Sequence, residues 1–304
     1  MSVMIDKNLL HITIAMYLFL WLFCVDSMNG QTKRALLIGI SEYNSTHSDV
    51  SDNDWANIHG ANDVDLLAAT LKQQRFQITR ITNRAANADR IRREIKRFAL
   101  SCKSDDIVYI HFSCHGQPVE DMNGDEEDGW DEALIPVDAK KVYQKGVYTG
   151  EKHIIDDELN GYFRTIRKNV GHNGFVYVVL DACHAGSSYR GDEEEDSVII
   201  RGTDSGFSMS SKPYVPSIDK RGKMKVEKSE MMANICVLEA CRSYQVNSEI
   251  KEKGKYYGSL SYYVNKVLQT IPLSRNISWT ERVTQLMNQD TRLIRQNPVI
   301  ETSL

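Results

Sequence analysis

Two short segments of this sequence carry residue types that can perform nucleophilic chemistry. Phe112-Ser113-Cys114-His115-Gly116 contains a histidine, and Leu180-Asp181-Ala182-Cys183-His184-Ala185-Gly186 contains a cysteine 68 residues later. A free thiol with a pKa of about 8.5 is mostly protonated at neutral pH and needs a base nearby. These two residue types therefore predict Cys183 as the nucleophile and His115 as the general base. The alternative is a buried structural cysteine and a histidine that donates to a neighbouring carbonyl.

The elements that must position these residues are two apolar strands. Each segment follows a short apolar run, at 106–112 and at 175–180. Further strands are expected at 34–40, 76–81 and 235–238, and helices at 60–74, around Ile91 to Phe98, and at 156–168, 258–270 and 278–290. Apolar strands that alternate with helices predict an α/β fold with a mainly parallel sheet covered on both faces. Functional residues in such sheets gather at the carboxyl ends of the strands, where both segments fall.

Composition excludes several other classes of protein. The chain has 304 residues, with 37 Lys+Arg, 41 Asp+Glu and a formal net charge of −4, which argues against a nucleic-acid binder. Apolar residues make up 41 % and charged residues 26 %, so disorder, collagen and coiled coil are excluded. Six cysteines are too few and too irregularly spaced for a disulfide scaffold or a CxxC zinc site.

The N-terminus predicts a separate targeting segment. Lys7 precedes an uncharged run over residues 8–25, and a polar stretch follows it. This pattern is typical of a secretory signal peptide, here residues 1–30, with an uncleaved anchor or a buried helix as alternatives. We therefore expect an exported protein, periplasmic or secreted, with residues 31–304 as the mature part and no stable membrane span after cleavage.

The two catalytic segments resemble those of the metacaspases, the caspase-like cysteine peptidases. The likeness extends to Ala35–Ile40, Gly60–Val64, Gly124–Asp138, Glu239–Gln245 and Tyr257–Tyr263, in the family's order. It implies a caspase-like α/β/α sandwich in an exported member of bacterial type. The family's layout would give a catalytic part at about 31–190, a long loop at about 187–230 and a small-subunit-like part at about 232–304.

The resemblance also implies roles at the reacting centre. Cys183 would be the nucleophile and His115 the base and later the acid, with amides near Gly116 and Cys183 forming the oxyanion hole. His184 would belong to the turn, and Cys114 would be a small packing residue.

Charge sets the expected substrate. Asp181 precedes the nucleophile by two residues, Asp63 matches the family's other pocket carboxylate, and Ser113 matches a further pocket position. Two carboxylates in one pocket favour Arg or Lys before the scissile bond. The plain alternatives are a helix cap for Asp63 and a strand-end acceptor for Asp181. We expect a monomeric cysteine endopeptidase acting on peptides or proteins; an Asp-specific peptidase and a non-catalytic scaffold at the envelope are the alternatives.

The acidic stretch at 117–138 raises the question of calcium. Glu126 stands where an EF-hand loop requires glycine, which argues against an EF-hand. The resemblance instead implies calcium ligands at Asp131, Asp156 and Asp157. The family's fourth aspartate aligns near Arg190, and this departure leaves calcium dependence open. We expect no required cofactor, with calcium as an optional ion and a solvated acidic loop as the alternative.

Residues 187–230 form a long polar segment without periodicity. A loop of this length in a compact domain is usually functional or disordered. It contains several basic residues, Arg201 among them. Given a pocket for basic side chains, the sequence predicts a self-cleavage loop, with no preferred bond; an uncleaved surface insertion is the alternative.

Overall fold

The computed structural model describes residues 31–43, 53–183, 198–203, 205–216, 226–293 and 295–304. The predicted signal peptide at 1–30 lies outside these residues. Lys33–Leu304 form one compact unit. Among the described residues, no helix has the length and hydropathy needed to cross a membrane.

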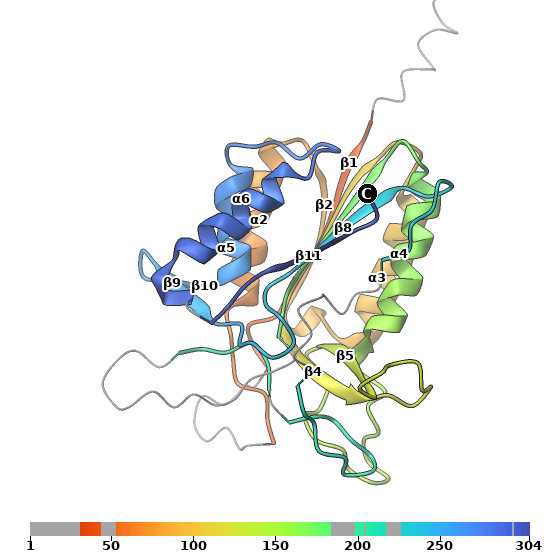
Figure 1. Cartoon of the computed structure of the whole chain (residues 1–304), viewed down its shortest axis with the longest axis vertical. Helices are drawn as coiled ribbons and strands as arrows, with labels where there is room; N and C mark the ends of the chain where they lie inside the picture. The colour runs from red at the N-terminus through yellow and green to blue at the C-terminus, as the bar shows by residue number, and fades with distance from the viewer. Residues whose placement is uncertain (1–30, 44–52, 184–197, 204, 217–225, 294) are drawn as a thin grey trace, which may run out of the picture. The chain divides into compact units, whose positions relative to one another are not determined.

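A six-stranded sheet forms the centre of this unit (Figure 1). Its strand order is β11-β8-β7-β3-β1-β2; β11 runs antiparallel to β8, and the other neighbours are parallel. The bounds are Lys33–Gly39 (β1), Gln77–Thr82 (β2), Ile107–Ser113 (β3), Phe175–Asp181 (β7), Asn234–Glu239 (β8) and Val299–Thr302 (β11). The five predicted strands are confirmed; β11 was not predicted from the sequence.

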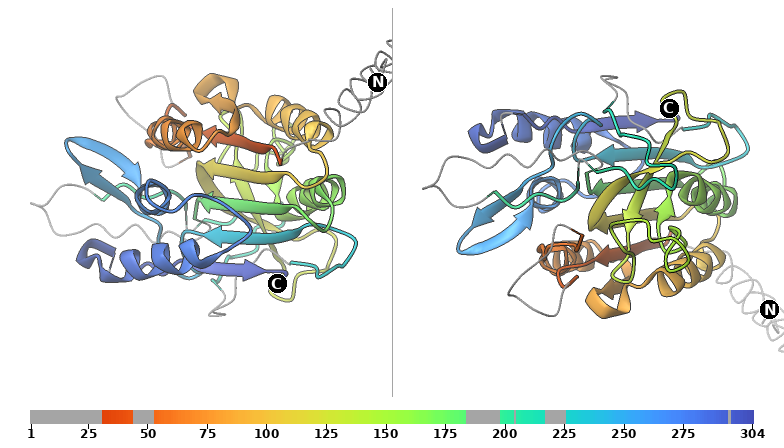
Figure 2. Two further views of the ribbon diagram at one scale, coloured as in Figure 1. Left: turned by 90° about the horizontal axis from the view of Figure 1, so that it is seen from above. Right: turned by 90° about the horizontal axis from the view of Figure 1, so that it is seen from below.

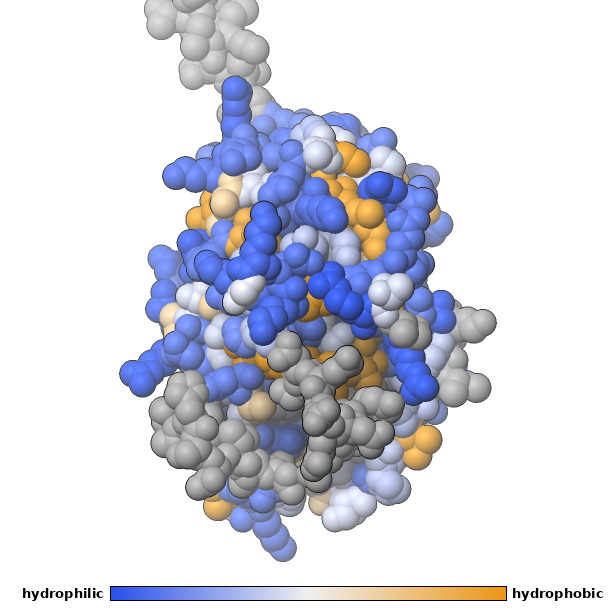
Figure 3. Space-filling view, turned by 90° about the vertical axis from the view of Figure 1, so that its left-hand side faces the viewer, coloured by the Kyte–Doolittle hydropathy of each residue, from blue (hydrophilic) through white to orange (hydrophobic). Residues whose placement is uncertain are grey.

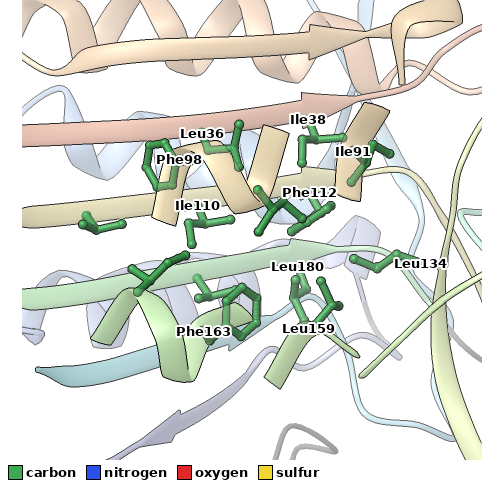
Figure 4. Packing of buried hydrophobic residues seen from close by; sticks show 14 of the residues in the cluster. Leu36, Ile38, Ile91, Phe98, Ile110, Phe112, Leu134, Leu159, Phe163 and Leu180 are labelled. Atoms are coloured by element: carbon green, nitrogen blue, oxygen red, sulfur yellow. The ribbon is translucent and has the colours of Figure 1, made fainter. Parts of the chain in front are cut away.

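Helices cover both faces of the sheet, which confirms the predicted α/β/α sandwich (Figure 2). Helices α2 (Gly60–Gln73), α5 (Ser259–Leu268) and α6 (Ser278–Gln289) lie on one face, and α3 (Ala88–Ser101) and α4 (Asp156–Val170) on the other (Figure 1). Strand side chains alternate between the faces, so β1 sends Leu36 and Ile38 toward α3 and α4, and Leu37 toward α2. Figure 4 shows Phe98 and Phe163 packed against the sheet face that α3 and α4 cover.

Two smaller sheets were not predicted. The strands β4 (His115–Glu120), β5 (Trp130–Ile135) and β6 (Ile154–Ile155) form one of them, below the carboxyl ends of the central strands in Figure 1. The strands β9 (Glu249–Glu252) and β10 (Lys255–Gly258) form a hairpin. Its turn at Lys253 and Gly254 has positive φ at both residues, as a type I′ hairpin turn requires. Both additions place polar residues beside the strand ends.

The surface seen in Figure 3 is mainly hydrophilic, with apolar side chains in small, separate patches. Single exposed apolar residues are ordinary on a soluble protein surface. The residues with the most unusual surroundings are instead buried at the carboxyl ends of β3 and β7.

Candidate functional site

The carboxyl ends of β3 and β7 lie side by side. Ser113 is in register with Asp181, the last residue of each strand. His115 opens β4 directly after β3, and Cys183 follows β7 by two residues. The topology therefore brings the two predicted catalytic segments to the same edge of the sheet.

His115 is held as a neutral base. Its Nε2 lies 2.8 Å from the carbonyl oxygen of Ala56, which can only accept, so Nε2 carries the proton. Its Nδ1 is buried and has no hydrogen-bond partner among the described residues. The ring stacks on Trp55, with centroids 4.9 Å apart, and burial lowers its pKa to about 4. The free lone pair of Nδ1 is thus available to take a proton near neutral pH.

Tyr43 fixes the start of β4. Its hydroxyl donates to the carbonyl oxygen of Ile135 at 2.8 Å and accepts from the amide of His115 at 3.0 Å. Neither Tyr43 nor Trp55 was predicted from the sequence, because both precede α2 in a polar segment without a motif.

Cys183 is fully buried, and its thiol turns toward the loop after β8. Its Sγ donates to the carbonyl oxygen of Gln245 at 3.0 Å and lies 3.4 Å from the Sγ of Cys241. Its amide donates to the carbonyl oxygen of Arg201 at 2.8 Å. The amide predicted for the oxyanion hole therefore already faces a carbonyl oxygen.

The three predicted pocket residues meet in one buried cluster. The hydroxyl of Ser113 donates to Oδ2 of Asp63 at 2.6 Å. Asp63 and Asp181 both form ion pairs with the guanidinium of Arg201. Asp63, Ser113 and Asp181 are fully buried. Oδ1 of Asp181 accepts from Asn247 at 2.7 Å, and its Oδ2 accepts from the amide of Ser261 at 2.7 Å.

The guanidinium in this pocket belongs to Arg201, which the sequence alone did not distinguish from the other basic residues of 187–230. Nη2 lies 2.7 Å from Asp63 Oδ2, and Nη1 lies 2.6 Å from Ser113 Oγ and 3.6 Å from Asp181 Oδ1. A third carboxylate, Glu249, accepts from Nε at 3.1 Å and from Nη2 at 2.8 Å. Glu249 was missed because β9 contains no motif that sets it apart.

Three carboxylates around one guanidinium leave the pocket with excess negative charge. Burial raises the pKa of Asp63 to about 7, although Arg201 opposes that rise. Burial also acts to raise the pKa of Glu249, yet Arg201 and His59 together hold it down at about 2. Nδ1 of His59 lies 2.5 Å from Glu249. The cluster is suited to a buried cation.

The backbone around Arg201 lies alongside residues 247–249 as an added strand. The amide of Arg201 donates to the carbonyl oxygen of Asn247 at 3.0 Å, and the amide of Glu249 donates to Ile199 at 2.9 Å. Ile200 pairs antiparallel with Ser248. Extended peptides are commonly recognised by such strand addition, with a side chain inserted in a specificity pocket.

The acidic loop after β4 brings three carboxylates together. Ligand atoms of Asp121, Asp125 and Asp131 all lie within 4.8 Å of one another. Oδ1 of Asp131 is buried without a partner among the described residues, and burial, then Asp156, raises the pKa of Asp131 to about 7. Hard oxygen donors in this arrangement fit a calcium ion.

Of the other residues predicted as ligands, Asp156 accepts from the amide of Glu132 at 3.4 Å and Asp157 accepts from Asn123 at 2.9 Å. The predicted set of Asp131, Asp156 and Asp157 therefore shares Asp131 with the observed cluster. The two other members of that cluster, Asp121 and Asp125, were not predicted as ligands. Arg190, near which the family's fourth aspartate aligns, lies outside the described residues.

Comparison with known proteins identifies the family. The model of the Caspase domain, Peptidase_C14, matches residues 32–304. The chain belongs to this family of caspase-like cysteine peptidases. Metacaspase-2 of Arabidopsis thaliana is 33 % identical over 171 residues, which are 53 % of this chain and 36 % of the relative. Metacaspase-1 of Eremothecium gossypii is 24 % identical over 299 residues, which are 86 % of this chain and 62 % of the relative. The chain thus spans about a third to three fifths of these relatives.

A solved structure of the same fold supports the architecture. Protein GSU0716 from Geobacter sulfurreducens superposes with a TM-score of 0.58 and 19 % identity, over 90 % of this chain and 93 % of its own. At that identity the likeness concerns the fold alone. Family membership and fold together confirm the resemblance drawn from the sequence.

Proposed function

We propose that this caspase-family protein is a cysteine endopeptidase that hydrolyses peptide bonds after Arg or Lys. Cys183 is the nucleophile and Nδ1 of His115 is the base. The observation that supports this specificity is the pocket of Asp63, Asp181 and Glu249, which surrounds a guanidinium at hydrogen-bonding distances. A pocket for an aspartate side chain would instead need cationic donors, and the described lining offers carboxylates.

The same observation supports a first cleavage within the chain itself. Arg201 occupies the pocket while its carbonyl oxygen accepts from the amide of Cys183, and these two contacts together support the Arg201 carbonyl as the scissile one. A Cβ built on Gly202 would fall 2.3 Å from the carbonyl oxygen of Cys183 and 3.1 Å from its Cβ. Glycine is therefore the residue that permits this close approach on the leaving-group side. We assign self-cleavage to the Arg201–Gly202 bond.

The chemistry needs a rotation of the thiol away from Gln245. The Cys183 sulfur then forms a bond to the carbonyl carbon of Arg201, while His115 takes the thiol proton. The C–N bond to Gly202 breaks as His115 returns the proton to the new amine. Water, activated by His115, hydrolyses the thioester and frees the Arg201 carboxylate.

Peptide hydrolysis tests the proposed activity. The full chain, Cys183→Ala and the matched thiol control Cys102→Ala would be assayed on fluorogenic peptides ending in Arg, Lys or Asp. We expect turnover of the Arg and Lys peptides by the wild type and Cys102→Ala, and none by Cys183→Ala. Turnover confined to the Asp peptide would contradict the pocket assignment. A folded chain without turnover of any peptide would favour the scaffold alternative.

Gel electrophoresis and N-terminal sequencing test the cleavage bond. The smaller fragment of the wild type should begin at Gly202, and Arg201→Gln should remain uncut at this position while Arg201→Lys is still cut. A fragment that begins elsewhere in 187–230 would overturn the assignment of the bond but not the activity.

Export is proposed separately. The apolar run and polar exit at 1–30 support a role as signal peptide. Fractionation of cells that express the full chain, followed by N-terminal sequencing of the exported form, tests this role. A product that retains Met1 in the cytoplasm would contradict it.

A further inference from the structure

Cys241 lies in direct contact with the proposed nucleophile, and the proposed mechanism gives it no role. Its Sγ donates to the Sγ of Cys183 at 3.4 Å, and both side chains are almost fully buried. These two residues form a small apolar cluster of their own, apart from the main cores. All five cysteines of the described residues are thiols.

One carbonyl holds the two sulfurs together. The carbonyl oxygen of Gln245 accepts from Cys183 at 3.0 Å and lies 3.5 Å from the sulfur of Cys241. The side-chain oxygen of Gln245 accepts from the amides of Arg242 and Asn297 at 3.2 and 3.1 Å, which fixes the loop after β8. The loop after β8 thus places the sulfur of Cys241 beside that of Cys183 in the side-chain rotamer that Cys183 adopts here.

A small cavity opens next to Cys241. Leu180, Ala182, Glu239 and Cys241 line it, together with Glu132, Arg242 and Ser243. The cavity reaches Cys241, whose sulfur contacts that of Cys183. The contact with Cys183, and then burial, raises the pKa of the Cys241 thiol.

We infer that Cys183 and Cys241 form a reversible disulfide that switches the peptidase off when hydroperoxides are present. The inference rests on the proposed function only for its consequence on activity. A bond to Cys241 would hold the sulfur of Cys183 on the side away from the Arg201 carbonyl and leave it without a nucleophilic electron pair for acyl transfer.

The reaction balances with hydrogen peroxide as the oxidant. The Cys183 thiolate attacks one peroxide oxygen, an S–O bond forms, the O–O bond breaks, and the leaving hydroxide takes the thiol proton as water. The Cys241 sulfur then attacks the sulfenic sulfur, the S–S bond forms, the S–O bond breaks, and a second water leaves. Two thiols are oxidised by two electrons, and one peroxide is reduced to two waters.

Mass spectrometry tests the bond without reference to activity. The full chain would be reduced, treated with hydrogen peroxide, alkylated and digested with trypsin under non-reducing conditions. Cys183 falls in the tryptic peptide 169–190, and Cys241 falls in 229–242, which also contains Cys236. We expect these two peptides to be linked in the wild type and in the control Cys236→Ala, and unlinked in Cys241→Ser.

Activity supplies the second readout. Hydrolysis of an Arg peptide by the wild type should fall at least tenfold after peroxide and return with dithiothreitol. Cys241→Ser, compared with its own untreated rate, should lose activity irreversibly, because Cys183 without a resolving thiol proceeds to sulfinic acid.

The outcomes separate the two proposals. A linked peptide from a protein that hydrolyses nothing when reduced would retain the disulfide and overturn the proposed function. Sulfinic acid at Cys183 in both the wild type and Cys241→Ser, with no linked peptide, would overturn the disulfide and leave the peptidase standing.

Discussion

The carbonyl oxygen of Arg201 lies 2.8 Å from the amide nitrogen of Cys183, while the side chain of Arg201 fills the acidic pocket. One residue therefore engages both the amide expected to stabilise an oxyanion and the pocket expected to select the substrate. The thiol itself points to Gln245. Arg201 thus occupies the pocket that we propose for a substrate side chain, while the thiol of Cys183 is turned aside. Under the proposed function, another substrate side chain can enter this pocket only after Arg201 leaves it.

Replacement of Arg201 by Ala should destabilise the protein. The change leaves Asp63, Asp181 and Glu249 buried without their cation, and losing one partner of a buried ion pair costs roughly 3–5 kcal/mol. We expect a lower melting temperature, and benzamidine should raise it in Arg201→Ala by occupying the vacated pocket, but not in the uncleaved Cys183→Ala chain. Arg80→Ala, which breaks an exposed pair with Asp65, is the control and should change stability by less than about 1 kcal/mol. An equal benzamidine shift in both proteins would contradict the pocket.

Removing the charge of Glu249 should weaken selection of arginine. Glu249 accepts from two nitrogens of the guanidinium, and a hydrogen bond to a charged group contributes about 1.5–3 kcal/mol. Glu249→Gln should therefore lower kcat/KM for an Arg peptide about 10- to 100-fold in processed enzyme. Glu252→Gln, on the same strand but bonded to Arg292, should leave kcat/KM nearly unchanged. Similar losses in both variants would show that the effect is structural.

The sequence predicted the elements whose pattern is periodic and local. The apolar runs of β1, β3, β7 and β8 and the amphipathic helices can be recognised without knowledge of their partners. The strands β11, β9 and β10 are only four residues long each, and their pairing depends on which neighbours the fold supplies. Such strands give little signal by themselves.

The same distinction applies within the site. His115, Cys183, Asp63 and Asp181 stand in short motifs that indicate their chemistry, and the structure brings the two aspartates into one pocket. The orienting group of His115 is a main-chain carbonyl, that of Ala56, which any residue could supply. Arg201 was one basic residue among several, and only its burial against three carboxylates sets it apart.

Trp55→Ala should shift the acid limb of the activity profile. Burial beneath Trp55 lowers the pKa of His115 to about 4, from an ordinary value of 6.5. Because the base must be neutral, wild-type kcat/KM should persist down to about pH 4, whereas the solvated histidine of the variant should lose activity between pH 7 and 5. The stability that neutral His115 contributes is present above pH 6.5 and is lost as the pH falls toward 4. A profile of kcat/KM from pH 4 to 8 checks the shift, with Trp130→Ala as a control. Coincident acid limbs in wild type and Trp55→Ala would contradict this account.

Calcium should stabilise the protein in a pH-dependent way through Asp131. Burial and then Asp156 raise the pKa of Asp131 to about 7 from 3.8, so the stability it contributes without metal is present below pH 3.8 and is lost as the pH rises through 7. Calcium binds the ionised form, and at about 100 times its Kd a ligand adds about 2.7 kcal/mol to the free energy of unfolding.

We expect calcium to raise the melting temperature at pH 8 and to raise it much less at pH 5, where protons compete for the carboxylate of Asp131. Asp131→Asn should abolish the calcium shift, while the exposed control Asp65→Asn keeps it. A calcium shift of equal size in Asp131→Asn and wild type would place the ion elsewhere or make the binding non-specific.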